Sequence, residues 1–201
     1  MRTNDKGKNQ RWERQKKKII NVAGRLFYQK GYQETTIDDI AKAGKMNKAT
    51  IYYYFKSKAI LLFEIVCGVM QEILELARPI ENSPMSPEEK LKALILQHVR
   101  WELSMKWPSI GLTERRNLPP KLLKDYLDLR DEYEAIFRKV MQARVKELEP
   151  HEDNLKLYSL FTLGLLNSFF HWYRPTGELS LEEIAEKAYI FIHRAISPQK
   201  K

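Results

Sequence analysis

Cysteine is nearly absent from this sequence: Cys67 is the only one in 201 residues. A single thiol cannot form an internal disulfide or supply a multi-cysteine metal site, and such sparing use of cysteine suits a reducing compartment. We interpret Cys67 as a small buried apolar residue, with a redox-sensing thiol as the alternative.

Long apolar runs are also missing. The most hydrophobic segment, residues 155–173, contains Asn167, Ser168 and His171, so it falls short of the roughly 20 apolar residues that a membrane-spanning helix needs. The basic N-terminus is not followed by the apolar stretch of a secretory signal. We therefore expect a soluble, cytoplasmic protein with no membrane partner.

The usual motifs of metal and phosphate catalysis do not occur. The sequence contains no His-Glu-x-x-His, no Glu-x-x-His and no glycine-rich phosphate loop, which argues against metalloprotease, di-iron and nucleotide-binding sites. His98 and Glu102 are four residues apart and could pair or bind a metal, although an ordinary hydrogen bond is the simpler interpretation. We expect no cofactor, no metal and no catalytic residue.

Positive charge is present in excess, and it is unevenly distributed. Residues 1–58 contain 15 Lys and Arg against 5 Asp and Glu, whereas residues 59–201 contain 20 against 21. An excess confined to one region is typical of a surface that binds phosphate. For residues 1–10 alone, a solvated basic tail is an equally good interpretation.

Residues 35–58 predict two short helices joined by a tight turn. Thr36 and Asp39 have the spacing of a capping box at the start of the first helix, and an apolar stripe at helical spacing follows. Gly44 stands where a left-handed joint is easiest to make, and Asn47 is expected to cap the second helix. This pattern predicts a helix-turn-helix.

The second of these helices has one apolar side and one polar, aromatic side. Ile51 and Phe55 are four residues apart and are expected to point inward. The opposite side is small, basic, hydroxyl-rich and aromatic. A helix held down on one side with such a front suits the major groove of DNA.

At this point a family resemblance is visible. Residues 11–60 resemble the DNA-binding domain of the TetR family of bacterial transcriptional regulators, and so many matches at fixed spacing are far more specific than one short motif. The resemblance implies an all-α fold of about nine helices: three form the DNA-binding domain, and the others form a bundle for ligand binding and dimerisation. The matching positions are Ala23, Leu26, Phe27, Gly31, Tyr32, Thr35, Thr36, Ile37, Ile40, Ala41, Ala43, Gly44, Thr50, Ile51, Tyr52, Phe55, Lys58 and Leu61.

The rest of the chain also reads as helical, since no segment alternates with period two. We expect a basic flexible arm at residues 1–10, a helix-turn-helix domain at 11–57, and a ligand-binding and dimerisation domain at 58–201. Ser86 and Ser180 each begin a capping-box pattern and predict the start of a helix in the last of these domains.

Several helix boundaries follow from apolar spacing and from proline. The first helix is expected at residues 11–30, and a fourth at residues 57–78, stopped by Pro79. A later, strongly apolar segment predicts one continuous helix over residues 153–173.

Carried over position by position, the resemblance implies a set of DNA contacts. Lys48 and Ala49 face base edges, and Tyr52 contacts a base or a thymine methyl group, with packing alone as the alternative for Tyr52. Asp38 would repel phosphate and is expected to point along the flank of its helix. The remaining members are Thr36, Thr50, Tyr54 and Lys58 as phosphate contacts, and Tyr53 as a groove contact or a cover for the small core.

The apolar segment at residues 153–173 also predicts a subunit interface. A helix that is apolar nearly all round must be buried on two sides, one against its own core and the other against a second subunit. A two-fold dimer would place two recognition helices roughly 34–36 Å apart, with a monomeric bundle as the alternative. The candidate interface residues are Phe161, Leu165, Phe169, Trp172, Ile184, Ala188 and Phe191.

The middle helices carry aromatic and methionine side chains with a few polar groups, a combination that fits a largely apolar ligand. The resemblance implies a small-molecule pocket in this region. Each of these side chains could also be an ordinary core residue. His98, Glu102 and Tyr133 belong to the same group but are not among the ligand candidates. The chosen ligand candidates are Trp101, Met105, Arg115, Arg116, Tyr126, Phe137, Met141 and Asn167.

Residues 114–139 and 171–185 resemble the corresponding parts of TetR-type regulators of fatty-acid and sterol degradation, which answer to acyl-CoA thioesters. This resemblance makes Arg115 and Arg116 candidates for the anionic CoA moiety, because the guanidinium fork matches phosphate geometry.

The resemblance thus implies a homodimeric repressor that binds a palindromic operator and is released by a small, largely apolar ligand. Ligand binding would shift the fourth helix, and a coupling of about 1–3 kcal/mol would weaken DNA binding roughly 5- to 150-fold. A non-specific, nucleoid-type DNA-binding protein is the main alternative, and an enzyme built on a helical bundle is a further one.

Overall fold

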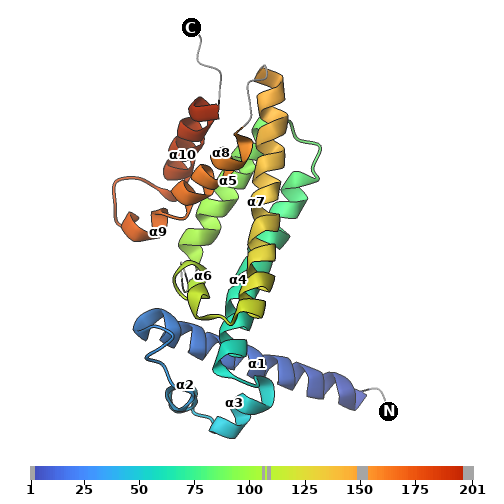
Figure 1. Cartoon of the computed structure of the whole chain (residues 1–201), viewed down its shortest axis with the longest axis vertical. Helices are drawn as coiled ribbons and strands as arrows, with labels where there is room; N and C mark the ends of the chain where they lie inside the picture. The colour runs from blue at the N-terminus through green and yellow to red at the C-terminus, as the bar shows by residue number, and fades with distance from the viewer. Residues whose placement is uncertain (1–2, 106, 108–109, 149–153, 197–201) are drawn as a thin grey trace. The chain divides into compact units, whose positions relative to one another are not determined.

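The computed structural model describes residues 3–105, 107, 110–148 and 154–196. Every regular element in these ranges is a helix (Figure 1), which confirms the all-α prediction. In chain order the elements are α1 Thr3–Lys30, α2 Ile37–Gly44, α3 Lys48–Tyr54, α4 Lys58–Glu81, α5 Pro87–Ser104, α6 Ile110–Thr113, the 3₁₀ turn η1 Arg115–Asn117, α7 Pro120–Leu148, α8 Leu155–Leu166, α9 Phe169–Trp172 and α10 Leu181–Ile196.

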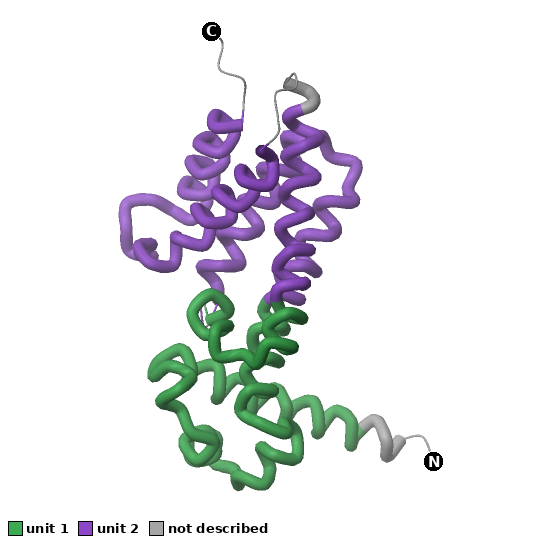
Figure 2. Tube along the Cα trace, in the orientation of Figure 1, with its two compact units in different colours: residues 1–69, 109–126 green, residues 70–108, 127–201 purple. Residues whose placement is uncertain are grey.

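The chain divides into two compact units (Figure 2). Unit 1 comprises residues 1–69 and 109–126, and unit 2 comprises residues 70–108 and 127–201. The division therefore falls within α4 and α7, whereas the sequence placed a boundary at residues 57 and 58. The segment that carries α6 and η1 is also counted with the N-terminal helices.

Unit 1 has a small core formed between α1, α2, α3 and the start of α4. The side of α1 that apolar spacing predicted is the buried one, and Ile19, Ala23 and Phe27 are fully enclosed. Thr35 is buried as well, and its hydroxyl donates to the carbonyls of Gly31 at 2.8 Å and Leu26 at 3.3 Å. Burying this hydroxyl therefore leaves no unmet hydrogen bond.

Helix α1 is longer than the sequence suggested. It begins at Thr3, whereas the expected start was Arg11 and residues 1–10 were expected to form a flexible arm. The segment before Arg11 contains Lys and Gln, which favour helix, and Gly7 is its one strong helix-weakening residue. Residues 1–2 of the expected arm lie outside the described residues.

Helix α4 also passes its predicted end. It continues through Pro79 to Glu81, whereas a stop before Pro79 was expected. Proline removes one backbone donor from the helix, and the turn that follows is supported by other bonds: Asn82 N–H donates to the Arg78 carbonyl at 3.0 Å, and the Ser83 hydroxyl donates to the Ile80 carbonyl at 2.7 Å.

In unit 2, α10 packs along α5, and α8 and α9 contact the same helix. Leu91, Leu94 and Ile95 form the buried side of α5. Both predicted capping boxes are confirmed: Ser86 with Glu89 opens α5, and the Ser180 hydroxyl accepts from the Glu183 N–H at 3.3 Å while the Glu183 carboxylate accepts from the Ser180 N–H at 2.8 Å.

The prediction of one continuous helix over residues 153–173 is wrong. The structure has two helices here, α8 and the short α9, separated at Asn167 and Ser168. The Ser168 hydroxyl donates to the Leu165 carbonyl at 2.7 Å, so the side chain bonds its own backbone in place of continuing the helix. The predicted start at Asp153 lies outside the described residues.

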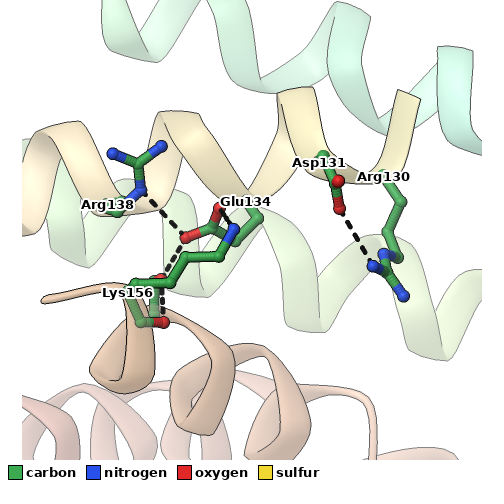
Figure 3. Close-up of polar contacts among 6 residues, drawn as sticks. Arg130, Asp131, Glu134, Arg138 and Lys156 are labelled. Carbon is green, nitrogen blue, oxygen red and sulfur yellow. Dashed lines mark hydrogen bonds and ion pairs between the residues drawn. The ribbon is translucent and has the colours of Figure 1, made fainter. Parts of the chain in front are cut away.

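A buried carboxylate fixes α8 against α7 within unit 2 (Figure 3). Glu134 on α7 is 2% exposed, and it accepts from Arg138 Nε at 3.3 Å and from Lys156 Nζ at 2.6 Å. The Ser159 hydroxyl on α8 also donates to it. Because two cations and a hydroxyl surround the carboxylate, its burial does not leave an unpaired charge.

Among the described residues, no helix combines the length and the apolar character that crossing a membrane would require.

Cys67 on α4 is buried, as expected, and burial raises the pKa of its thiol to about 12. The thiol therefore stays protonated near neutral pH and is a poor nucleophile.

Candidate DNA-binding surface and effector region

The start of α2 is fixed by the predicted capping box. The Thr36 hydroxyl accepts from the Asp39 N–H at 3.1 Å, and the Asp39 carboxylate accepts from the Thr36 N–H at 2.9 Å. The same hydroxyl donates to this carboxylate at 2.7 Å, and these bonds lower the pKa of Asp39. The Thr36 hydroxyl is therefore already paired at the place where a phosphate contact was predicted.

The turn between α2 and α3 differs from the prediction in one residue. Lys45, with φ of 52°, adopts the left-handed conformation, and Gly44 is the last residue of α2. A Cβ atom at Gly44 would come within 2.4 Å of the terminal methyl group of Met46, which is the flexible end of that side chain and could move aside. The Met46 N–H donates to the Ala41 carbonyl at 3.0 Å, which closes the helix end in the manner of a Schellman motif.

Helix α3 presents two different sides. Ile51 is fully buried and Phe55, just after the helix, is 2% exposed, as predicted from their spacing. Tyr52 is 47% exposed and Tyr53 is 75% exposed, so these rings are available on the outer side. Asn47 is the N-cap residue of α3, as predicted, although its side chain makes no capping hydrogen bond.

Two charged side chains connect α2 and α3. Lys48 Nζ lies 2.9 Å from the Asp38 carboxylate, and this bond raises the pKa of Lys48. Asp38 was expected along the flank of its helix, and the structure shows it paired with the first residue of α3. The two side chains are 49% and 70% exposed, so the pair is solvated, and a phosphate or a base acceptor could replace Asp38 as the partner of Lys48 at small cost.

The remaining predicted contacts on α3 differ in exposure. Ala49 is exposed and Thr50 is half-buried. Tyr54 packs its ring against Trp12 of α1, with ring centroids 5.3 Å apart, and it is half-buried. The long α1 helix therefore supports the end of α3 through an aromatic contact.

Lys58 has a different environment from the one predicted. Its ammonium donates to the carbonyls of Tyr32 at 2.7 Å and Thr35 at 2.8 Å, and it lies 4.1 Å from the centre of the Tyr32 ring. Desolvation lowers the pKa of this side chain. In this structure Lys58 holds the turn between α1 and α2, and that role gives a structural reason for a lysine here.

The predicted effector residues are divided between the two units. In unit 2, Trp101, Phe137 and Met141 are buried, whereas Met105 and Asn167 are half-buried. They come from α5, α7 and the ends of α5 and α8. The three residues from α5 and α7 are thus core positions of the bundle.

The other three effector candidates lie in unit 1. Tyr126 is 2% exposed, and its hydroxyl donates to the Gly111 carbonyl at 3.0 Å. Arg115 is half-buried and donates to the Leu112 carbonyl, while Arg116 is exposed. Arg116 is therefore the more accessible of the two guanidinium groups.

Helix α5 also buries two polar side chains, His98 and Glu102, that were not among the predicted ligand candidates. His98 is 2% exposed and Glu102 is 3% exposed, and His98 Nδ1 lies 2.9 Å from the Tyr133 hydroxyl. Desolvation lowers the pKa of His98 to about 4 and raises the pKa of Glu102 to about 7. Within the described ranges, no group of three or more His, Cys, Asp or Glu side chains could hold a metal ion.

The predicted interface residues fall into two sets. Phe161, Trp172 and Phe191 are more than half exposed, which is unusual for large apolar side chains. Leu165 is half-buried, whereas three members belong to the core of their own unit: Phe169, Ile184 and Ala188. The exposed set, with Leu157 and Leu160, forms apolar surface on α8, α9 and α10.

These features define the class of protein: an all-helical chain with a helix-turn-helix head and a helical C-terminal region. Comparison with known families identifies it further. Residues 19–65 match the family of bacterial regulatory proteins called tetR, and residues 84–196 match the tetracyclin repressor-like C-terminal domain. The chain therefore belongs to the TetR family of transcriptional regulators, which bind DNA, and the resemblance found in the sequence is confirmed.

Individual relatives agree with this assignment. The chain is 27% identical over 177 residues, 87% of its length and 86% of the relative's, to the HTH-type transcriptional repressor KstR2 of Rhodococcus jostii. The crystal structure of the TetR-family regulator PfmR of Thermus thermophilus has a TM-score of 0.78 at 27% identity, covering 90% of this chain and 99% of PfmR. AibR, solved in complex with isovaleryl coenzyme A and operator DNA, shares the fold at 23% identity, with a TM-score of 0.77 and coverage of 88% and 97%.

Proposed function

We propose that this TetR-family regulator is a repressor that binds a palindromic operator as a homodimer and leaves it when a small, largely apolar effector binds. The observation that carries the proposal is the outer side of α3. Ile51 and Phe55 fix this helix to the rest of the helix-turn-helix region at residues 11–57, which we call the head, while Tyr52 and Tyr53 are exposed. The surrounding residues 1–58 hold 15 basic against 5 acidic side chains.

DNA recognition is proposed to use α3 in the major groove. Lys48 and Ala49 are both exposed at the first turn of α3, where recognition helices contact base edges. Tyr52 supplies a ring and a hydroxyl to a neighbouring base. Phosphate contacts from Thr36, Thr50, Tyr54 and the surrounding lysines position the helix, since phosphate contacts fix register and base contacts give specificity.

Lys58 keeps its predicted phosphate role only if its ammonium exchanges a backbone carbonyl for a phosphate oxygen. Its bonds to the carbonyls of Tyr32 and Thr35 favour the alternative, in which it organises the turn that precedes α2. We therefore rank it below the α3 residues as a DNA contact.

Dimerisation is proposed to use the exposed apolar side of α8, α9 and α10. Phe161 and Phe191 are 62% and 65% exposed, and covering such rings in a second subunit removes them from water. A two-fold dimer also fits a palindromic site, because protein symmetry and operator symmetry match. Phe169, Ile184 and Ala188 support this surface from inside their own unit.

The effector is proposed to be an acyl-CoA thioester. The support is the 27% identical relative, whose name KstR2 is shared by a ketosteroid transcriptional regulator of Mycobacterium tuberculosis, and the AibR complex, which shows that this fold can hold a CoA thioester and DNA. Arg115 and Arg116 are proposed for the CoA phosphates. The effector would alter α4, which runs from the head at Lys58 into unit 2 at residue 70, and so weaken DNA binding.

The experiment that tests this function is a selection of random double-stranded DNA on the purified protein at physiological salt. A palindrome should be enriched and bound at least about 10³-fold more tightly than random DNA. Tyr52→Ala should abolish this preference, and Tyr28→Ala on α1 is a matched control, because the two rings are 47% and 46% exposed. Equal affinity for all sequences would show a non-specific, nucleoid-type binder and overturn the proposal.

The dimer is tested separately. Phe191→Asp should give monomers by light scattering, because a carboxylate in a subunit interface is buried without a partner. Leu179→Asp is the control, since this residue is 40% exposed and lies before α10. A Phe191→Asp protein that is still a dimer would place the interface elsewhere.

A further inference from the structure

One turn of α5 brings three polar side chains to the same side of the helix inside unit 2. His98, Trp101 and Glu102 are spaced three and four residues apart and are 2%, 8% and 3% exposed. Aromatic rings surround them: the His98 ring lies 6.0 Å from Trp101, 5.8 Å from Tyr133 and 6.4 Å from Phe137, measured between centroids.

The described part of the chain leaves polar atoms of all three side chains without a hydrogen bond. Trp101 Nε1, Glu102 Oε1 and His98 Nε2 are each enclosed and without a hydrogen-bond partner in the described part of the chain. The Asn167 side chain opposes the fall in the His98 pKa, although it does not reach hydrogen-bonding geometry with Nε2. Buried polar groups are paired in the great majority of cases, so three open positions within one helical turn indicate a missing partner.

The rest of the bundle shows that the chain can pair its buried polar groups. Glu134, on the neighbouring α7, is equally enclosed but has two cations and a hydroxyl around it. Among the described residues no cation pairs with Glu102, and desolvation raises its pKa to about 7. An uncharged Glu102 can both donate and accept a hydrogen bond.

We propose that His98, Trp101 and Glu102 form the subsite that recognises an uncharged oxygen group, a ketone or a hydroxyl, on the apolar part of the effector. The Trp101 N–H donates to the ligand oxygen, Glu102 and His98 Nε2 complete its hydrogen bonds, and the Tyr133 and Phe137 rings contact the carbon skeleton. This inference rests on the proposed function, because it names the polar group by which the effector is selected.

The chemistry of the three groups discriminates between ligand classes. A carboxylate would lie beside Glu102 without a compensating cation, which disfavours it in a buried site. A purely apolar ring would leave all three polar atoms unpaired, at the cost that burial of unpaired groups carries. A ketone or a hydroxyl can accept from Trp101 without adding a charge.

The test uses probes of one size and shape that differ in their polar group: cyclohexanone, cyclohexanol, cyclohexylamine, cyclohexanecarboxylate and methylcyclohexane. They are titrated into the ¹⁵N-labelled full-length protein without DNA, and the indole N–H signals of its four tryptophans are followed by NMR. Trp101→Phe identifies the signal of Trp101. We expect cyclohexanone and cyclohexanol to shift that signal at millimolar concentration and to bind more tightly than the other three probes.

Variants then test the residues. Glu102→Leu removes both the donor and the acceptor, and it should weaken binding of the two oxygen probes roughly three- to tenfold, the effect of one hydrogen bond. Glu178→Leu is the matched control, because this glutamate is exposed in the loop before α10, and it should leave binding unchanged. If a variant does not fold, the probe selectivity of the unaltered protein still tests whether the subsite prefers an uncharged oxygen group.

Other outcomes overturn the inference. Preference for the amine would show that Glu102 acts as a buried counter-ion, and equal binding of methylcyclohexane would show that the polar atoms are satisfied by buried water. Absence of any shift would show that the subsite does not take ligands. None of these results affects operator selection, which is measured on DNA alone, so failure of this inference is distinguishable from failure of the proposed function.

Discussion

The helix-turn-helix of unit 1 and residues 98–102 near the end of α5 in unit 2 differ in how their buried polar groups are paired. In the head, the buried Thr35 hydroxyl has two carbonyl acceptors and the Lys58 ammonium has two close ones. On α5, by contrast, Trp101 and Glu102 each bury an atom that has no partner among the described residues. The buried groups of the helix-turn-helix are thus paired within it, whereas those of α5 are unpaired, which is typical of a binding site.

The largest expected effect tests whether the head is a well-packed structure. Phe27 is fully buried in α1, and Phe27→Ala should lower the free energy of unfolding by about 3–5 kcal/mol through lost contacts and a cavity. Tyr53→Ala, at a 75% exposed position, should change it little. The measurement is urea unfolding followed by circular dichroism, and similar midpoints for both variants would show that the head core is loose.

A second prediction concerns pH and the α5 turn. Burial raises the pKa of Glu102 from 4.5 to about 7, so the folded protein favours its uncharged form, and the free energy of unfolding falls as pH rises from about 4.5 to about 7. Burial lowers the pKa of His98 from 6.5 to about 4, so the folded protein favours the uncharged imidazole, and the free energy of unfolding falls as pH falls from about 6.5 to about 4. Between pH 4.5 and 6.5 the two effects oppose each other.

Glu102→Gln should therefore reveal the contribution of His98. The variant should lose about 1–3 kcal/mol of unfolding free energy between pH 6.5 and pH 4.5 beyond any loss in the unaltered protein. Glu178→Gln, in the exposed loop before α10, is the control. Parallel pH dependence in all three proteins would mean that the α5 groups are more solvated than the structure indicates.

The smallest expected effects concern the capping box, a motif that occurs in both units. Thr36→Ala and Ser180→Ala each remove the hydroxyl of a capping box and should each cost about 1 kcal/mol of stability. Only Thr36→Ala should also weaken operator binding, because Thr36 begins the helix that supports α3. Thermal melting and a DNA-binding titration on both variants check this, and equal DNA affinity would remove Thr36 from the DNA-binding surface.

The sequence predicted the features that depend on local spacing. Ile51 and Phe55 are buried as expected, and the capping boxes at Thr36, Ser86 and Ser180 are present, because a cap involves residues only three positions apart. The family was also recognisable, since its signature is concentrated in the head.

Features that depend on distant residues were not predicted. Lys58 bonds to carbonyls 23 and 26 residues earlier, and no pattern in the sequence reveals such a pairing. Gly44 was expected to take the left-handed position that Lys45 occupies, because residue spacing does not fix the last residue of a helix to better than one or two positions. The apolar pattern continues across Asn167 and Ser168, so it could not reveal the break between α8 and α9.

Cys67 has a practical consequence for studying the regulator. Its thiol is buried and has a pKa of about 12, so it should react slowly with maleimides and other thiol reagents. A cysteine introduced at Tyr53, on the exposed side of α3, would then be the fast-reacting thiol in the protein. Fluorescent or spin labels could be attached there without removing the native residue, and they would report DNA binding and release in real time.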